Sequence, residues 1–129
     1  MRSILFPLDS LILTNSNSGK AIALRLANDG YDVCINDIAG NKSEAEEVAK
    51  QVQNIGRKSF VYTADVSNLS EVQSLVQASV SELGPLNTMV ANAGIAQVKA
   101  LLDLEEQDLK RMFEVNGASS TGFFRLRSN

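Results

Sequence analysis

Histidine is absent from the 129 residues of this chain, and cysteine occurs only once. Without an imidazole, the chain can hold neither a Ser/His or Cys/His nucleophile nor a histidine-ligated zinc site. The one cysteine, Cys34, lies inside the apolar run 31–35, so it can form no internal disulfide and supply no metal cluster. We expect no metal site, and any chemistry must come from other side chains.

Clusters of positive charge and long apolar runs are missing as well. A net charge of -3 and a sequence pI of about 4.9, with no segment rich in Lys or Arg, argue against nucleic acid as a partner. The longest apolar stretch, residues 4–13, is interrupted by a proline and two polar residues, so it is too short to span a membrane. Its charged start is weakly similar to a signal peptide, but no small-x-small cleavage site follows. We therefore expect a cytoplasmic protein without a membrane partner.

Apolar runs of strand length alternate with segments of helical periodicity along the chain. With 44% hydrophobic residues, 129 residues suffice for one modest core, so residues 1–129 are interpreted as a single domain. The expected strands are residues 11–14, 31–35, 60–63 and 88–91. The expected helices begin at Lys20, at Asn41, at Ser67 or Asn68, and at Asp103. This alternation predicts an α/β fold with a parallel, doubly wound sheet.

Each expected helix carries an apolar face and an end signal. Gly30 stands where a left-handed C-terminal cap is wanted, Gly84-Pro85 ends the third helix, and Asn41-x-x-Glu44 resembles a capping pair. The residues expected to face inward are Ile22, Ala23, Leu26 and Ala27, then Ala45, Val48, Ala49, Val52 and Ile55, then Leu69, Val72, Leu75, Val76, Val80 and Leu83, and finally Leu109, Met112 and Phe113.

In a parallel sheet of this kind, ligands bind at the carboxyl ends of the strands. Gly19 follows the first expected strand, at a turn where free helix N–H groups could receive a phosphate. An ordinary polar turn before a helix explains the same residues. Asp37 ends the second strand, eighteen positions after Gly19 (37 minus 19), near the spacing expected of an acid that binds an adenosine ribose. A solvated loop aspartate remains the alternative.

Two more strand ends carry candidate binding residues. Asp65 and Val66 follow the third strand, where an acid could meet an adenine amino group and the valine could pack on the ring; a loop acid before a helix cap is equally consistent. Asn92, Ala93 and Gly94 follow the fourth strand, and two small residues there leave space for a ligand.

Taken in order, these segments resemble the short-chain dehydrogenase/reductase family over about residues 19–116. The stretches that carry the resemblance are 19–23, 36–37, 63–66, 86–94 and 113–116. Residues 93–104 are similar to diacetyl and acetoin reductases within that family. The resemblance implies a Rossmann fold, a nicotinamide dinucleotide cofactor, and hydride transfer at a carbonyl or secondary alcohol carbon.

The resemblance also implies roles for individual residues. Asp37 would hold the ribose and favour NAD over NADP, because a carboxylate repels a 2′-phosphate. Asp65 and Val66 would contact adenine, and residues 92–94 would form the floor of the cofactor site. Asn116 would be the one catalytic residue, supporting a proton relay.

Two departures from the family pattern bear on function. In the phosphate-binding loop, Leu13 and Asn17 stand where the family has two of its three glycines, so we expect weakened cofactor binding. The family's Tyr-x-x-x-Lys pair is absent, because Tyr31 and Tyr62 are followed four residues later by Ile35 and Val66. Catalysis by these residues alone is therefore not expected.

The leading hypothesis is a truncated, catalytically incomplete short-chain dehydrogenase/reductase corresponding to the first βαβαβαβ half of the fold. One alternative is a non-catalytic nucleotide-binding or interaction module that oligomerises or pairs with a full-length relative. Another is a misannotated fragment, because the resemblance fades before Gly19 and after Asn116.

Overall fold

Four parallel strands form one sheet in the order β3-β2-β1-β4. The computed structural model of the chain describes residues 8–13, 17–92, 94, 103 and 105–118. The strands are β1 (Leu8–Leu13), β2 (Tyr31–Asp37), β3 (Ser59–Thr63) and β4 (Leu86–Val90). The predicted parallel α/β sheet is confirmed.

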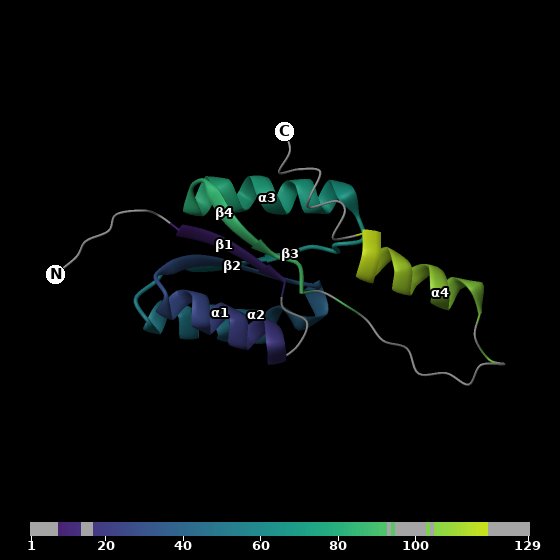
Figure 1. The fold of residues 1–129 in the computed structure, drawn as a ribbon, viewed down its shortest axis with the longest axis horizontal. Coiled ribbons are helices and arrows are strands. Elements are labelled where there is room, and N and C mark those ends of the chain that lie inside the picture. Colours follow the sequence, from purple (N-terminus) through teal and green to yellow (C-terminus); the bar gives the residue numbers. More distant parts are fainter. Residues whose placement is uncertain (1–7, 14–16, 93, 95–102, 104, 119–129) are drawn as a thin grey trace.

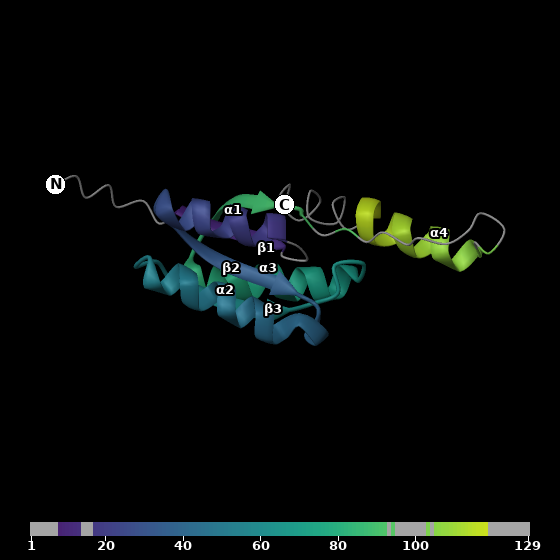
Figure 2. The same cartoon turned by 90° about the horizontal axis from the view of Figure 1, so that it is seen from below.

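Helices cover both faces of this sheet. In chain order they are α1 (Asn17–Asn28), α2 (Lys42–Asn54), α3 (Leu69–Leu83) and α4 (Glu106–Phe113), with a short 3₁₀ turn η1 (Ala39–Asn41) and a π-helical turn η3 (Glu114–Ala118). α1 and α2 lie side by side on one face and α3 lies on the other, whereas α4 extends beyond the carboxyl ends of the strands (Figures 1 and 2). The predicted doubly wound arrangement is therefore present.

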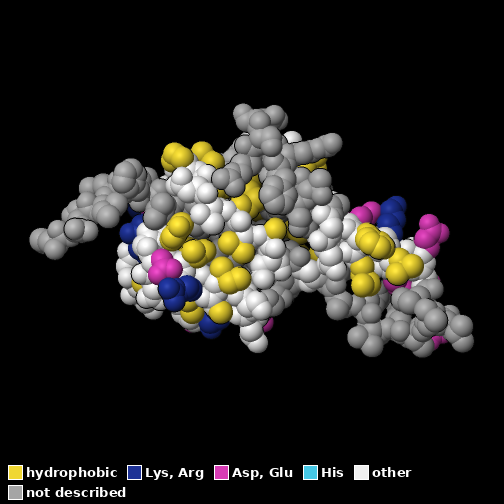
Figure 3. Space-filling model, in the orientation of Figure 1, with side chains coloured by type: hydrophobic (Ala, Val, Ile, Leu, Met, Phe, Trp, Pro, Cys, Tyr) yellow, Lys and Arg dark blue, Asp and Glu magenta, His cyan; other side chains and the backbone are white. Residues whose placement is uncertain are grey.

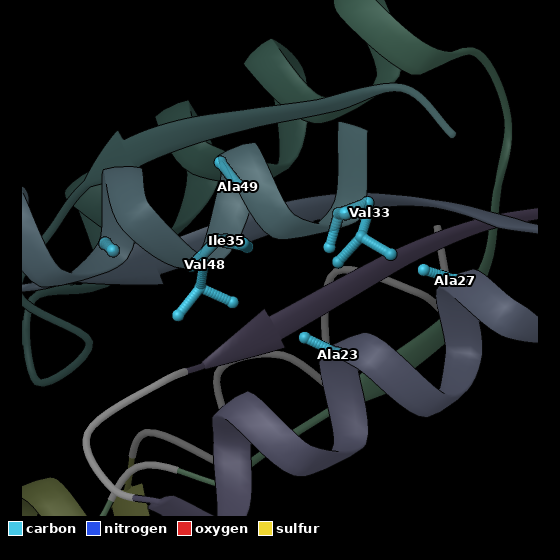
Figure 4. Packing of buried hydrophobic residues seen from close by; sticks show 8 residues of the cluster. Ala23, Ala27, Val33, Ile35, Val48 and Ala49 are labelled. Carbon is cyan, nitrogen blue, oxygen red and sulfur yellow. The ribbon is translucent and has the colours of Figure 1, made fainter. Parts of the chain in front are cut away.

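The larger part of the core lies between β2 and the helix pair α1 and α2. Val33 and Ile35 point from β2 toward small residues of α1 and branched residues of α2 (Figure 4). Ala23 and Ala27 of α1 are buried, so this helix lies close to the sheet. Most of the inward-facing residues predicted for these two helices are thus confirmed.

A second core cluster lies on the opposite face of β2, under α3. Cys34 is its member from β2, and Val72, Leu75 and Leu83 are its members from α3. Successive residues of a strand point to opposite faces, so Val33 and Ile35 serve one cluster while Cys34 serves the other. The buried, unpaired state predicted for Cys34 is confirmed.

Several predicted element boundaries shift by a few residues. β1 begins three residues before the predicted 11–14, α1 begins at Asn17 rather than Lys20, and β4 spans 86–90 rather than 88–91. Gly30 has a φ value of 100°, which confirms the predicted left-handed C-terminal cap of α1. Gly84 ends α3 as predicted, with a φ value of 103° that is open to glycine. Asn68 caps α3 as predicted, because its side chain accepts hydrogen bonds from the N–H groups of Ser70 and Glu71.

Two cap predictions are wrong. α4 begins after Glu105, not after Asp103, because Glu105 and Asp108 form a reciprocal capping box. Asn41 does occupy the N-cap position of α2, but its side chain makes no capping bond. Its amide is instead directed to Asp37, as described below.

Five residues predicted to face inward are exposed: Ile55, Leu69, Val80, Leu109 and Phe113. The first two lie at helix ends, because Ile55 is the C-cap residue of α2 and Leu69 is the first residue of α3. On α3 the buried positions are 72, 75, 79 and 83, so Ser79 is buried where Val80 was expected to be. Its hydroxyl donates to the Leu75 carbonyl oxygen at 2.8 Å, which permits its burial.

α4 differs most from its prediction. None of its residues is buried, η3 continues it directly from Glu114, and it extends beyond the carboxyl ends of the strands (Figure 1). Within the part of the chain that the structure describes, no helix is long and apolar enough to cross a bilayer.

Candidate functional site

The candidate binding residues converge on the carboxyl edge of the sheet because the strands are parallel and in register. Leu13 of β1 pairs with Asn36 of β2, and Asp37 of β2 pairs with Thr63 of β3. On the other side of β1, Ile12 pairs with Val90 at the end of β4. Strands β2 and β4 flank β1, and the connection from β3 to β4 reverses the direction of strand order. Such a reversal is where open α/β sheets form their binding crevice.

Gly19 lies in the first turn of α1 and is buried. The N–H groups of a first helical turn lack intrahelical partners, and the helix dipole adds partial positive charge there. This turn faces the same edge as the strand ends, since α1 follows β1 directly. The preceding residues 14–16 lie outside the described residues.

Asp37 lies at the last position of β2 and is nearly buried. Its Oδ1 atom accepts a hydrogen bond from the Ile38 N–H at 2.7 Å and another from Asn41 Nδ2 at 3.2 Å. Two donors, one on η1 and one on the adjoining backbone, therefore fix the direction of the carboxylate. This is the preorganisation that an acceptor of ligand hydroxyls requires.

Asp65 lies just beyond β3, in the connection to α3, and is exposed. Its Oδ1 accepts hydrogen bonds from the hydroxyl of Ser67 at 2.6 Å and from the N–H of Ser67 at 2.9 Å. These bonds lower the pKa of Asp65, partial burial opposes them, and the positive charge of Arg111 adds to the lowering. Asp65 is thus a charged group at the sheet edge, close enough to α4 to interact with its arginine.

Val66 lies in the core cluster beneath α3 and is only 8% exposed. Its side chain therefore helps to anchor the β3–α3 connection on the sheet. The predicted contact with an adenine ring is not tested by this placement and stays a prediction.

The segment after β4 approaches the π-helical turn η3. A Cβ atom built on Gly94 would lie 3.4 Å from Oδ1 of Asn116, so the glycine backbone and the asparagine side chain are neighbours. Asn92, at the start of this segment, is half-buried. The structure therefore brings the predicted catalytic Asn116 next to Gly94, in the segment that follows β4. Ala93 lies outside the described residues, and the roles predicted for these residues remain predictions.

Two asparagines at this edge were not predicted as site residues. Asn36 is buried at the end of β2 and donates to backbone carbonyls of β3, and Asn41 donates to the Asp37 carboxylate. The signals for Asn36 were its place in the family-like stretch 36–37 and an amide within a strand, where asparagine is uncommon. Asn41 matches a capping pattern, which predicts a bond to the backbone of α2 and not its contact with Asp37.

Comparisons with known proteins agree with this geometry. The family model for short chain dehydrogenases matches residues 15–126. A short-chain dehydrogenase/reductase of Armillaria gallica is 42% identical over 98 residues, which are 76% of this chain and 38% of that protein. A diacetyl reductase ((S)-acetoin forming) of Staphylococcus epidermidis is 40% identical over 98 residues, or 76% of this chain and 37% of the reductase.

Solved structures show the same fold. A double mutant of the Serratia marcescens short-chain dehydrogenase/reductase superposes with a TM-score of 0.82 at 32% identity, covering 89% of this chain and 47% of that one. The chain spans about 40% of the length of the curated relatives it matches. The family match begins after β1 and comprises β2 to β4 and every helix described above. The chain therefore belongs to the short chain dehydrogenase family.

Proposed function

We propose that this chain is the cofactor-holding segment of an oxidoreductase that interconverts a carbonyl compound and a secondary alcohol. The observation that carries the proposal is the carboxylate of Asp37, fixed by two donors at the end of β2. That position adjoins β1, where the strand order reverses. Family membership supports a nicotinamide dinucleotide as the ligand.

The described residues fit the adenosine half of such a cofactor. The Asp37 carboxylate would accept hydrogen bonds from the ribose hydroxyls, and the first turn of α1 would face the pyrophosphate. Asp65 and Val66 would lie beside adenine, and Asn92, Ala93 and Gly94 would form the floor beneath the rest of the molecule. When bound, the cofactor supplies or accepts a hydride.

NAD is the proposed cofactor rather than NADP. An ionised carboxylate placed against a ribose repels the two negative charges of a 2′-phosphate. Asp37 is held in place by hydrogen bonds, so it cannot easily turn away from such a group. The diacetyl reductases among the relatives support a small carbonyl compound as the substrate.

We further propose that these 129 residues bind the cofactor without turning over substrate. Asn116 would support a proton relay, but neither Tyr31 nor Tyr62 is followed by a lysine in the required spacing. Val66, four residues after Tyr62, is part of the core and supplies no positive charge in the place of the family's lysine.

Calorimetric titration with NAD and NADP tests the proposal. The chain is expected to bind NAD saturably and more tightly than NADP, and Asp37→Asn is expected to weaken NAD binding by about 1–2 kcal/mol while it reduces the preference over NADP. Asp32→Asn, at the opposite end of β2, is the matched control and should leave NAD affinity unchanged. Equal NAD affinity of the wild-type chain and Asp37→Asn would refute the ribose-binding role, and diacetyl reduction by the purified chain would refute the lack of turnover.

A further inference from the structure

Asn36 is a polar residue buried at the carboxyl end of the central strand β2, with 2% of its surface exposed. Its Nδ2 atom lies 2.8 Å from the Tyr62 carbonyl oxygen, 3.3 Å from that of Ala64 and 3.4 Å from that of Asp37. One amide group therefore ties the ends of two neighbouring strands together.

Packing alone does not account for an asparagine at this position. Asparagine is disfavoured within strands, and a buried amide without partners costs about 1–3 kcal/mol. Cys34, two residues earlier on the same face, shows that a small apolar side chain suits the cluster under α3. The hydrogen bonds of Asn36 are thus the feature that sets it apart from its neighbours.

These hydrogen bonds fall beside the two acids of the candidate site. Asp37 follows Asn36 directly, and Asp65 follows Ala64 directly. The Ala64 N–H also donates to the Asp37 carbonyl oxygen at 3.1 Å, so the two segments are joined by side-chain and backbone bonds. A shift of the β3–α3 connection would change the separation of the two carboxylates.

We propose that Asn36 is a positioning residue that holds the Asp37 and Asp65 segments at the spacing needed to bind a dinucleotide. The inference rests on the function proposed above and deepens it. Asn36 itself is not proposed to contact the ligand. It acts through the backbone of the two residues that carry the carboxylates.

Asp32 offers a matched comparison at the other end of the same strand. It lies on the same face of β2 as Asn36, is also buried, and likewise ties β2 to the chain next to β3. Its Oδ1 forms an ion pair with Arg57 Nη2 at 2.8 Å and accepts a hydrogen bond from the Lys58 N–H at 2.9 Å. Removing either side chain should loosen β3, but only Asn36 borders the candidate site.

The test is a double-mutant cycle on NAD affinity, measured by calorimetry on the full chain. Asn36→Ala and Asp37→Asn are each expected to weaken NAD binding about tenfold. The double variant should bind NAD more tightly than the product of the two single effects predicts, because part of the effect of Asn36 acts through Asp37. Asp32→Ala should lower the unfolding midpoint in urea yet keep NAD affinity within about twofold of wild type. Asn36→Thr, with its higher strand propensity, replaces Asn36→Ala if the latter does not fold.

Each outcome separates the inference from the proposed function. Absence of NAD binding by the wild-type chain would refute the proposed function and the inference with it. NAD binding that weakens in Asp37→Asn but not in Asn36→Ala would refute the inference alone, as would multiplicative effects in the double variant. Loss of affinity in Asp32→Ala equal to that in Asn36→Ala, or failure of both Asn36 variants to fold, would show that Asn36 serves the fold in general, which also contradicts the proposal.

Discussion

At the residue scale, the side chains of β2 have different roles at different positions along the strand. Asp32 and Asn36 hold the two ends of β3, while the three residues between them fill the cores on both faces of the sheet. Arg57, the partner of Asp32, is itself partly buried. A buried ion pair is costly to break, because the remaining charge loses its partner. The exposed pair of Arg25 and Asp29 on α1 has no such consequence.

Cys34 gives a prediction about pH. Burial raises the pKa of its thiol to about 12, and a hydrogen bond with Ser79 offsets only part of this effect. The unfolded thiol ionises from about pH 9.0, so above that pH the unfolded state loses its proton first. Ionisation of Cys34 should therefore leave the free energy of unfolding unchanged below pH 9. Between pH 9 and 12 it should lower that free energy by at most about 1.4 kcal/mol per pH unit.

Urea unfolding of the wild-type chain and of Cys34→Ala at several pH values checks this expectation. The difference between the two unfolding free energies should change only above pH 9. In addition, a thiol reagent at pH 8 should label Cys34 far faster in urea than in buffer. Rapid labelling of the folded chain would contradict the burial of this residue.

At the element scale, two asparagines at helix N-cap positions have different tasks. Asn68 accepts hydrogen bonds from the first turn of α3, whereas Asn41 donates to Asp37 and leaves α2 without a side-chain cap. The sequence pattern at the two positions is alike. The difference arises because a fixed carboxylate stands near Asn41.

Asn68→Ala should therefore lower the free energy of unfolding by about 1 kcal/mol and leave NAD affinity unchanged. Asn41→Ala should do the reverse, with little loss of stability and weaker NAD binding, because the Asp37 carboxylate loses a donor. Chemical denaturation and calorimetry on the two variants provide the comparison. The same stability loss in both variants would mean that Asn41 caps α2 after all.

α4 combines a strongly amphipathic sequence with an open apolar side. Phe113 is 75% exposed and Leu109 is 47% exposed, and apolar atoms gather over this helix in Figure 3. Such a cluster promotes association in water. The oligomer or pairing with a longer relative predicted from the sequence would use a surface of this kind, and it remains a prediction.

Phe113→Glu should reduce self-association without lowering the unfolding midpoint, because the ring contributes little to the described core. Sedimentation velocity over a range of concentrations, together with thermal unfolding, would show this. Lys110→Glu, which changes charge on the same helix, controls for a general charge effect. A clear loss of thermal stability in Phe113→Glu would mean that the ring is buried in solution.

At the scale of the whole molecule, the layered architecture could be predicted from the sequence. The hydrophobic periodicity of each segment and the order of strands and helices along the chain are enough to define it. Alternating apolar runs and helical stripes predicted the parallel sheet, and the carboxyl-edge rule placed Gly19, Asp37 and Asp65 at one edge. The side-chain network could not be predicted in the same way. The bond from Asn36 to Tyr62 joins residues 26 positions apart, and no local pattern encodes a contact at that separation. The prediction that Leu109 and Phe113 of α4 face inward is wrong, because helical periodicity indicates an apolar face but not what covers it.

Chemical-shift mapping of NAD binding to the isotopically labelled chain is the most direct test of a dinucleotide site at this edge. We predict that the backbone amides of Gly19, Asp37, Asp65 and Asn92 shift on titration. The amides of Asp32, Lys58 and Gly84, at the amino edge of the sheet, should remain in place and serve as the internal reference. Shifts confined to the amino edge or to α4, or no saturable shift at all, would contradict a dinucleotide site at the carboxyl ends of β1 to β4.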